Sequence, residues 1–123
     1  MLLYHYSNAD IKDKLKVKYA FINAYSSNDK KACNIKRLFF YISKQPKEHR
    51  FNNVKYCYII KLDKNNIYDL TQDKMNYKKK YLNNINKLLN TIKKHYIGIK
   101  YNVGFDIVCL FQNIKYNKKI QVF

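Results

Sequence analysis

The feature that most constrains the fold of this chain is a strict alternation of residue types between Val54 and Leu62. Val54, Tyr56, Tyr58, Ile60 and Leu62 alternate with Lys55, Cys57, Ile59 and Lys61. Successive side chains of a β-strand point to opposite faces, so this period of two predicts a strand. The chain is therefore expected to fold around a β-sheet.

Other short apolar runs predict further strands at Leu2–Tyr6, Val17–Tyr25, Arg37–Ser43 and Ile67–Leu70, on both sides of a turn at Gly104, and from Ile114 to Val122. Two segments have helical signals instead. Ser7 and Asp10 form a capping-box pattern that predicts a short helix over Asn8–Leu15. Apolar residues at spacings of three and four predict one long amphipathic helix over Met75–His95, with Leu82, Ile85, Leu89, Ile92 and Tyr96 on its buried face.

This order of elements predicts an α+β fold with mainly antiparallel, short-stranded sheets, one long helix and one or two short ones. The regular alternation of strands and ten-residue helices that parallel βαβ folds need is missing. At 123 residues, the chain is long enough for one domain with a buried core, so we expect a single domain over 1–123.

Several common active-site motifs are absent from the sequence. The two glycines, Gly98 and Gly104, cannot form a P-loop or a dinucleotide-binding glycine motif. The three histidines and the three cysteines lack the spacings of metal ligands, so no metal is expected. The N-terminus has no basic region ahead of its apolar stretch, and no apolar run is long enough to cross a membrane. We therefore expect a soluble, cytoplasmic protein without membrane contact.

The formal net charge is +17, from 25 Lys and Arg residues against eight Asp and Glu residues. Such an excess attracts polyanions and acidic partners. It agrees equally with the Lys-, Asn-, Ile- and Tyr-rich composition that AT-rich coding produces. Lysines cluster on the expected long helix, at Lys78, Lys79, Lys80, Lys87, Lys93 and Lys94. This face is either a solvated surface or a contact surface for an acidic or nucleic-acid-bearing complex.

Three short segments combine residues that can carry chemistry. Tyr4-His5-Tyr6-Ser7 ends the first predicted strand, and Asn23-Ala24-Tyr25-Ser26-Ser27 ends the second strand region. Asp106 is the only carboxylate side chain in the last fifty residues, and it directly precedes the apolar run Ile107–Phe111. Each has an ordinary structural alternative: a packed histidine, one of thirteen tyrosines, and an acid that caps a turn.

Taken together, these segments resemble the ADP-ribosyltransferase superfamily, in particular its His-Tyr-Glu/Asp/Gln branch. His5 matches the histidine of the first strand, Tyr25 the tyrosine, and Asp106 the late carboxylate, while Tyr96-Ile97-Gly98-Ile99 matches the strand before it. The resemblance implies NAD as substrate, with His5 on a ribose hydroxyl, Tyr25 against the nicotinamide and Asp106 stabilising the oxocarbenium-like transition state. It also implies cofactor contacts from Tyr6, Ser7, Ser26 and Ser27.

The resemblance implies a mono-ADP-ribosyltransferase that modifies a host protein or nucleoprotein complex. By similarity to small phage members, a CRISPR or other defence complex is an expected target, in the host cytoplasm. Two alternatives remain. One is a non-enzymatic basic protein that blocks a nucleic-acid-binding groove. The other is transfer of an RNA 2′-phosphate to NAD, which uses a cluster of arginines that Arg37 and Arg50 alone hardly supply.

Overall fold

The computed structural model describes residues 1–18, 35–45, 54–82 and 84–122. Within them, one sheet contains seven strands in the order β5-β6-β7-β3-β1-β4-β9, and β2 pairs with β8 in a separate two-stranded sheet. The strands are β1 (Leu2–Ser7), β2 (Lys14–Leu15), β3 (Leu38–Tyr41), β4 (Tyr56–Lys61), β5 (Ile67–Asp69), β6 (Gly98–Asn102), β7 (Asp106–Leu110), β8 (Ile114–Lys115) and β9 (Lys118–Gln121).

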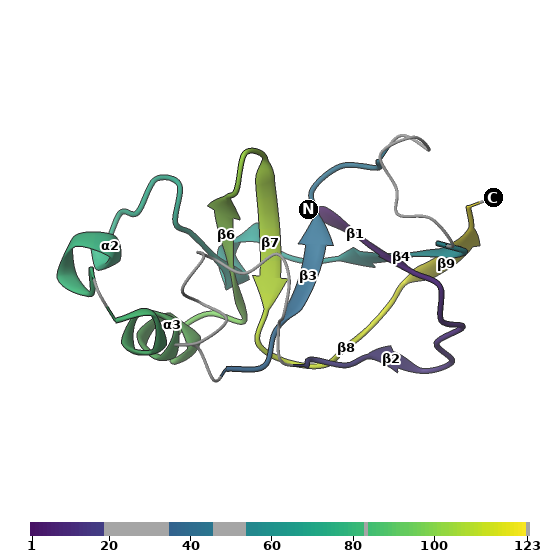
Figure 1. The fold of residues 1–123 in the computed structure, drawn as a ribbon, viewed down its shortest axis with the longest axis horizontal. Coiled ribbons are helices and arrows are strands. Elements are labelled where there is room, and N and C mark those ends of the chain that lie inside the picture. Colours follow the sequence, from purple (N-terminus) through teal and green to yellow (C-terminus); the bar gives the residue numbers. More distant parts are fainter. Residues whose placement is uncertain (19–34, 46–53, 83, 123) are drawn as a thin grey trace.

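Every strand pair is antiparallel except β5 with β6, which is parallel. The alternating segment at 54–62 forms β4, which pairs with β1 along its whole length. The expected mixed α+β architecture, with more strand than helix, is therefore confirmed at this level. Figure 1 shows the helices beside β6 and β7, at the opposite end of the sheet from β9 and the C-terminus.

The prediction of one long helix over Met75–His95 is wrong. The segment contains two helices, α2 (Tyr77–Lys80) and α3 (Ile85–Lys93), and a short 3-10 helix, η2 (Lys64–Asn66), lies further upstream. The first helix, α2, ends at Lys80, and Asn84 begins the second, because its side chain accepts the backbone N–H of Lys87 at 3.0 Å and caps α3. As a result Leu82, expected on the buried face, is 76% exposed.

The helix predicted over Asn8–Leu15 is also absent. Ser7 does accept the N–H of Ala9, at 3.1 Å, but the next backbone groups bond to distant tyrosines. The hydroxyl of Tyr58 accepts the N–H of Ile11 at 2.7 Å and donates to the carbonyl of Ala9 at 2.6 Å. The hydroxyl of Tyr116 donates to the carbonyl of Ile11 at 2.7 Å. These tertiary hydrogen bonds use the groups that a helix would have paired internally.

The strand predicted from Ile114 to Val122 is divided into β8 and β9, which belong to different sheets. Asn117 lies between them, and its side-chain oxygen accepts the N–H of Lys61 while its own N–H donates to the carbonyl of Ile59, both at 2.8 Å. The Asn117 side chain thus accepts a backbone N–H of β4 that a carbonyl of a continuous neighbouring strand would otherwise accept. Of the strand predicted over Val17–Tyr25, only residues 17 and 18 are described, and Lys18 bridges Arg37.

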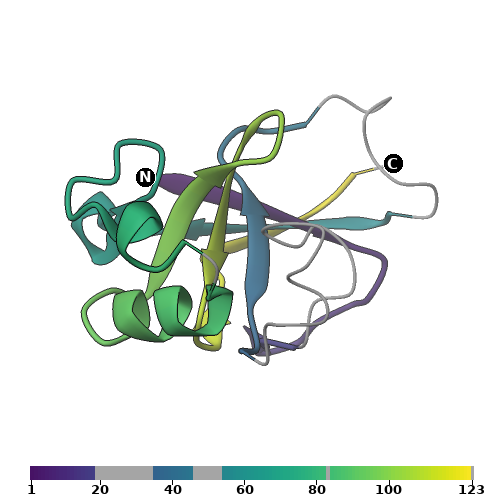
Figure 2. The same ribbon diagram turned by 60° about the vertical axis from the view of Figure 1, so that its left-hand side comes forward.

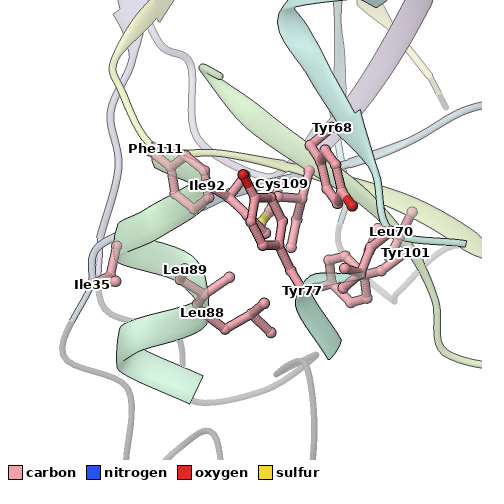
Figure 3. Close-up of a cluster of buried hydrophobic side chains, with 12 residues drawn as sticks. Ile35, Tyr68, Leu70, Tyr77, Leu88, Leu89, Ile92, Tyr101, Cys109 and Phe111 are labelled. Carbon is pink, nitrogen blue, oxygen red and sulfur yellow. The ribbon is translucent and has the colours of Figure 1, made fainter. Parts of the chain in front are cut away.

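Two apolar cores lie on the two faces of the sheet. On the helix-covered face, Leu88, Leu89 and Ile92 of α3 pack against side chains of the strands, as Figure 3 shows. Figure 2, turned by 60°, shows the same two helices lying in front of one face of the sheet. The other face carries a second cluster around Leu3, Phe40, Tyr58, Val108 and Leu110. The described residues contain no helix long and apolar enough to span a membrane.

Candidate functional site

His5 lies near the end of β1 on the face of the second core. The strand register places it opposite Tyr58 of β4, and its ring centroid lies 5.5 Å from that of Phe40 and 6.4 Å from that of Tyr58. Its Nδ1 atom is 2.8 Å from the carbonyl oxygen of Phe39 on β3. A carbonyl oxygen only accepts, so Nδ1 carries the hydrogen in this contact. In the neutral ring, Nε2 is then the acceptor.

The surroundings of His5 favour its neutral form. Burial lowers the pKa of His5 below its ordinary value, and the positive charge of Lys18 lowers it further, while the hydrogen bond to the Phe39 carbonyl opposes both. A neutral imidazole with Nδ1–H directed at the backbone presents Nε2 to a hydroxyl donor such as a sugar hydroxyl.

A cavity of about 520 Å³ lies beside His5, at the end of β1 where the chain turns toward β2. Four of the residues that line it are lysines at alternate positions: Lys12, Lys14, Lys16 and Lys18. Ser7 and Leu38 also line it, and Asp13 is its one carboxylate among the described lining residues. A cavity of this size with an excess of cations suits a ligand that carries phosphate groups.

The lysines of this cavity were not among the residues that we predicted for the site. The alternation of lysines at 12, 14, 16 and 18 with Asp13, Leu15 and Val17 does not single them out, because the three residues between them line the same cavity. The expected helix over Asn8–Leu15 also gave no reason to place them there.

Asp106 begins β7, and both its polar contacts are on β6. Its Oδ1 accepts the side-chain N–H of Asn102 at 3.0 Å, and its Oδ2 lies 3.8 Å from Nζ of Lys100. Gly104, with φ of 98°, allows the tight turn between the two strands, and its N–H donates to Oδ1 of Asn102 at 2.9 Å. Asp106 thus closes a hairpin and is also about one-third exposed.

His5 and Asp106 lie on the same face of the sheet but do not touch. Tyr4 of β1 and Ile107 of β7 both pair with Tyr41 of β3, so the two strands run in the same direction with β3 between them. This register puts the Cα atoms of His5 and Asp106 about 12 Å apart, from two strand spacings and two residue steps. The carboxylate of Asp106 leans toward β6, on the side of β7 away from β1.

The other predicted cofactor contacts are distributed differently. Ser7 lines the cavity with His5. Tyr6 points to the opposite face, where its hydroxyl accepts the N–H of Gln45 at 2.8 Å and its ring meets that of Tyr41 edge-on at 5.8 Å. Tyr25, Ser26 and Ser27 lie outside the described residues. The described residues also contain no group of three His, Cys, Asp or Glu side chains that could hold a metal ion.

No protein-family model, no curated protein and no solved structure matches this chain.

Proposed function

We propose that this protein is a mono-ADP-ribosyltransferase that binds NAD in the cavity beside His5. The observation that carries the proposal is the His5 imidazole, whose Nδ1 atom bonds to the Phe39 carbonyl, in the wall of a cavity lined by four lysines. The lysines suit the pyrophosphate of NAD, and the Nε2 lone pair of His5 suits a ribose hydroxyl. The resemblance of the sequence to the ADP-ribosyltransferase superfamily supplies the reaction.

In this proposal Asp106 stabilises the positive charge that develops on the ribose when the bond to nicotinamide breaks. Its position on the same sheet face as His5 supports this role, since both side chains can approach one sugar from different strands. The carboxylate must then turn from its hairpin partners, Asn102 and Lys100, toward β3 and β1. Tyr25 is assigned to the nicotinamide by resemblance alone.

The test compares the wild-type chain with Asp106→Asn and His5→Phe. Each protein is incubated with NAD labelled in its adenine and with a bacterial lysate, and labelled protein bands are followed; the NAD-induced rise in melting temperature is measured separately. We expect Asp106→Asn to lose labelling and keep the rise. His5→Phe, which keeps a ring against Phe40 and Tyr58, is expected to lose both.

His95→Phe is the matched control, because His95 is exposed beyond the C-terminal end of α3. It should behave as the wild-type chain does. The proposal is overturned if the wild-type chain shows no labelled band and no rise in melting temperature with NAD.

A second candidate function is non-enzymatic binding to an acidic or nucleic-acid-bearing complex. The observation that favours it is Tyr81, which lies after α2 with the ammonium groups of Lys80 and Lys87 each 5.7 Å from its ring centroid. Hydrogen bonding with Thr91 lowers the pKa of Tyr81; burial opposes this, and the positive charges of Lys80, Lys87 and Lys94 lower the pKa further. A ring among cations is a stacking platform for a base, with phosphates on the lysines.

This second function is tested with a fluorescent single-stranded RNA and Tyr81→Ala. Binding should weaken steeply as salt is raised, because counterions are released from the phosphates. Tyr81→Ala should reduce affinity while Asp106→Asn does not. An affinity that is indifferent to both salt and Tyr81 would contradict this function.

A further inference from the structure

A second cavity, of about 590 Å³, lies at the β5 edge of the sheet. Residues that line it include Met1, Lys64, Tyr68, Lys74, Met75 and Lys100. It is separate from the cavity beside His5, because Met1 and His5 stand near opposite ends of β1. Its volume is in the range of cavities that hold small organic ligands.

The polar lining of this second cavity is positively charged. It contains Lys64, Lys74 and Lys100 against a single carboxylate, Asp69, among the described lining residues. Asp69 is already engaged, since its Oδ1 accepts both the N–H and the hydroxyl of Thr71. The side chain of Lys100 is 25% exposed, and its Nζ forms an ion pair with Oδ2 of Asp106 at 3.8 Å. Lys64 and Lys74 are exposed. The cavity therefore offers at least two ammonium groups to an anion.

The apolar lining includes two tyrosines, of which Tyr96 is half-buried and Tyr68 is only 4% exposed, so the aromatic surface open to a ligand is that of Tyr96. The Tyr68 hydroxyl donates to Oδ1 of Asp73 and accepts the N–H of Met75 at 3.0 Å, so the ring is fixed at its far end. Its centroid lies 5.3 Å from that of Tyr96, which also lines the cavity. Met75 is 58% exposed, so its flexible apolar side chain is available to contact a ligand in the cavity.

Cations and exposed apolar surface in one cavity suit a ligand with an anionic end and a flat apolar end. We propose that this cavity binds a free mononucleotide, with the phosphate on Lys64 and Lys74 and the base against Met75 and Tyr96. The side-chain amides of Asn65 and Gln72, which also line it, can bond to the edge of a base. This site goes beyond the proposed transferase function and does not depend on it.

The experiment is calorimetric titration of the full chain with AMP, with adenosine and with inorganic pyrophosphate. AMP should bind more tightly than either of the other two, because only AMP uses both the lysines and the apolar side chains of Met75 and Tyr96. The variant is Lys64→Ala with Lys74→Ala, and the matched control is Lys14→Ala with Lys16→Ala, which removes two lysines from the other cavity. Loss of charge-assisted contacts should weaken AMP binding about tenfold or more in the variant.

The control should bind AMP as the wild-type chain does, and Met75→Ala should weaken AMP binding and leave that of pyrophosphate unchanged. The proposal is overturned if the wild-type chain does not bind AMP, if pyrophosphate binds the Lys14→Ala, Lys16→Ala protein as tightly as AMP does, or if the two double variants lose affinity for AMP equally. His5→Phe should leave AMP binding intact, so failure of the transferase proposal and failure of this one are distinguishable.

Discussion

The Nδ1–H of His5 donates to the carbonyl oxygen of Phe39 at 2.8 Å, which ties β1 to its neighbour β3 through a side chain. This contact fixes the tautomer of the neutral ring and leaves Nε2 as the acceptor. Because a backbone carbonyl makes the bond, substitution of the Phe39 side chain would not remove it. The orientation of His5 therefore depends on the pairing of β1 with β3 and on the packing of Phe40 and Tyr58.

Protonation of His5 should destabilise the fold at acid pH. Burial lowers the pKa of His5, so the unfolded chain takes up a proton at a higher pH than the folded chain does. The free energy of unfolding should consequently fall as the pH drops below the ordinary histidine value of 6.5. Above that value both states are neutral at His5, and the effect is absent. Urea unfolding of the wild-type chain and of His5→Phe at several pH values between 5 and 8 measures the difference.

In His5→Phe the part of this pH dependence that comes from His5 should disappear, whereas His95→Phe should keep it. The stability difference between His5→Phe and the wild-type chain should therefore change with pH below about 6.5 and be constant above it. A difference that stays constant over the whole range would show that His5 is not held neutral.

Asp106→Asn should cost little stability whatever its effect on activity. The contact of Asp106 with Lys100 is a single 3.8 Å ion pair at a partly exposed position, and such pairs contribute about 0–1 kcal/mol. Asparagine also retains an oxygen that can accept from Asn102. We therefore expect the free energy of unfolding, measured with urea, to change by no more than about 0.5 kcal/mol, as for most surface substitutions. Asp63→Asn is the control, since Asp63 is exposed and asparagine preserves its cap on η2.

The two glycines should resist substitution for different reasons. A Cβ at Gly98 would lie 2.3 Å from the carbonyl oxygen of Cys109, a backbone atom that cannot move aside, so Gly98→Ala should destabilise by about 3 kcal/mol. Gly104 has nothing within 4 Å, but its φ of 98° strains any other residue, and Gly104→Ala should cost about 1 kcal/mol.

Gly104→Asn should be milder than Gly104→Ala, because asparagine tolerates positive φ, while Gly98→Asn should be no better than Gly98→Ala. Chemical denaturation of the four variants ranks them. Equal costs for both alanine variants would contradict the steric account of Gly98.

Local sequence pattern located β1, β3, β4 and β5, because each lies within a short run of apolar and aromatic residues. It failed where a polar side chain competed with the backbone. Asn84 interrupts an apolar spacing that is continuous through Ile85 and Leu89, and no count of apolar positions detects that cap. Asn117 similarly divides the last apolar run between two sheets. Both failures are side-chain hydrogen bonds that substitute for backbone ones.

The candidate site was predictable only as separate residues. The apolar runs of the sequence place His5 within one strand and Asp106 at the start of another, as the structure has them. Their relative position depends on β3 pairing between them, which is a long-range contact that the two segments do not encode locally. The contact between Asp106 and Lys100 likewise depends on the register of β6 with β7.

Tyr58→Phe tests whether tertiary hydrogen bonds hold residues 8–12 out of a helix. The buried Tyr58 hydroxyl bonds to the backbone of Ala9 and Ile11, and its removal leaves both backbone groups without that partner. We expect a loss of about 1–3 kcal/mol in the free energy of unfolding. We also expect faster hydrogen exchange at the amide of Ile11, measured by NMR.

The matched control is Tyr56→Phe, on the same face of β4 but only half-buried, which should change neither quantity. Unchanged exchange at Ile11 in Tyr58→Phe would mean that the Tyr58 hydroxyl does not exclude the helix, and that local sequence or the bond of Tyr116 to the Ile11 carbonyl does.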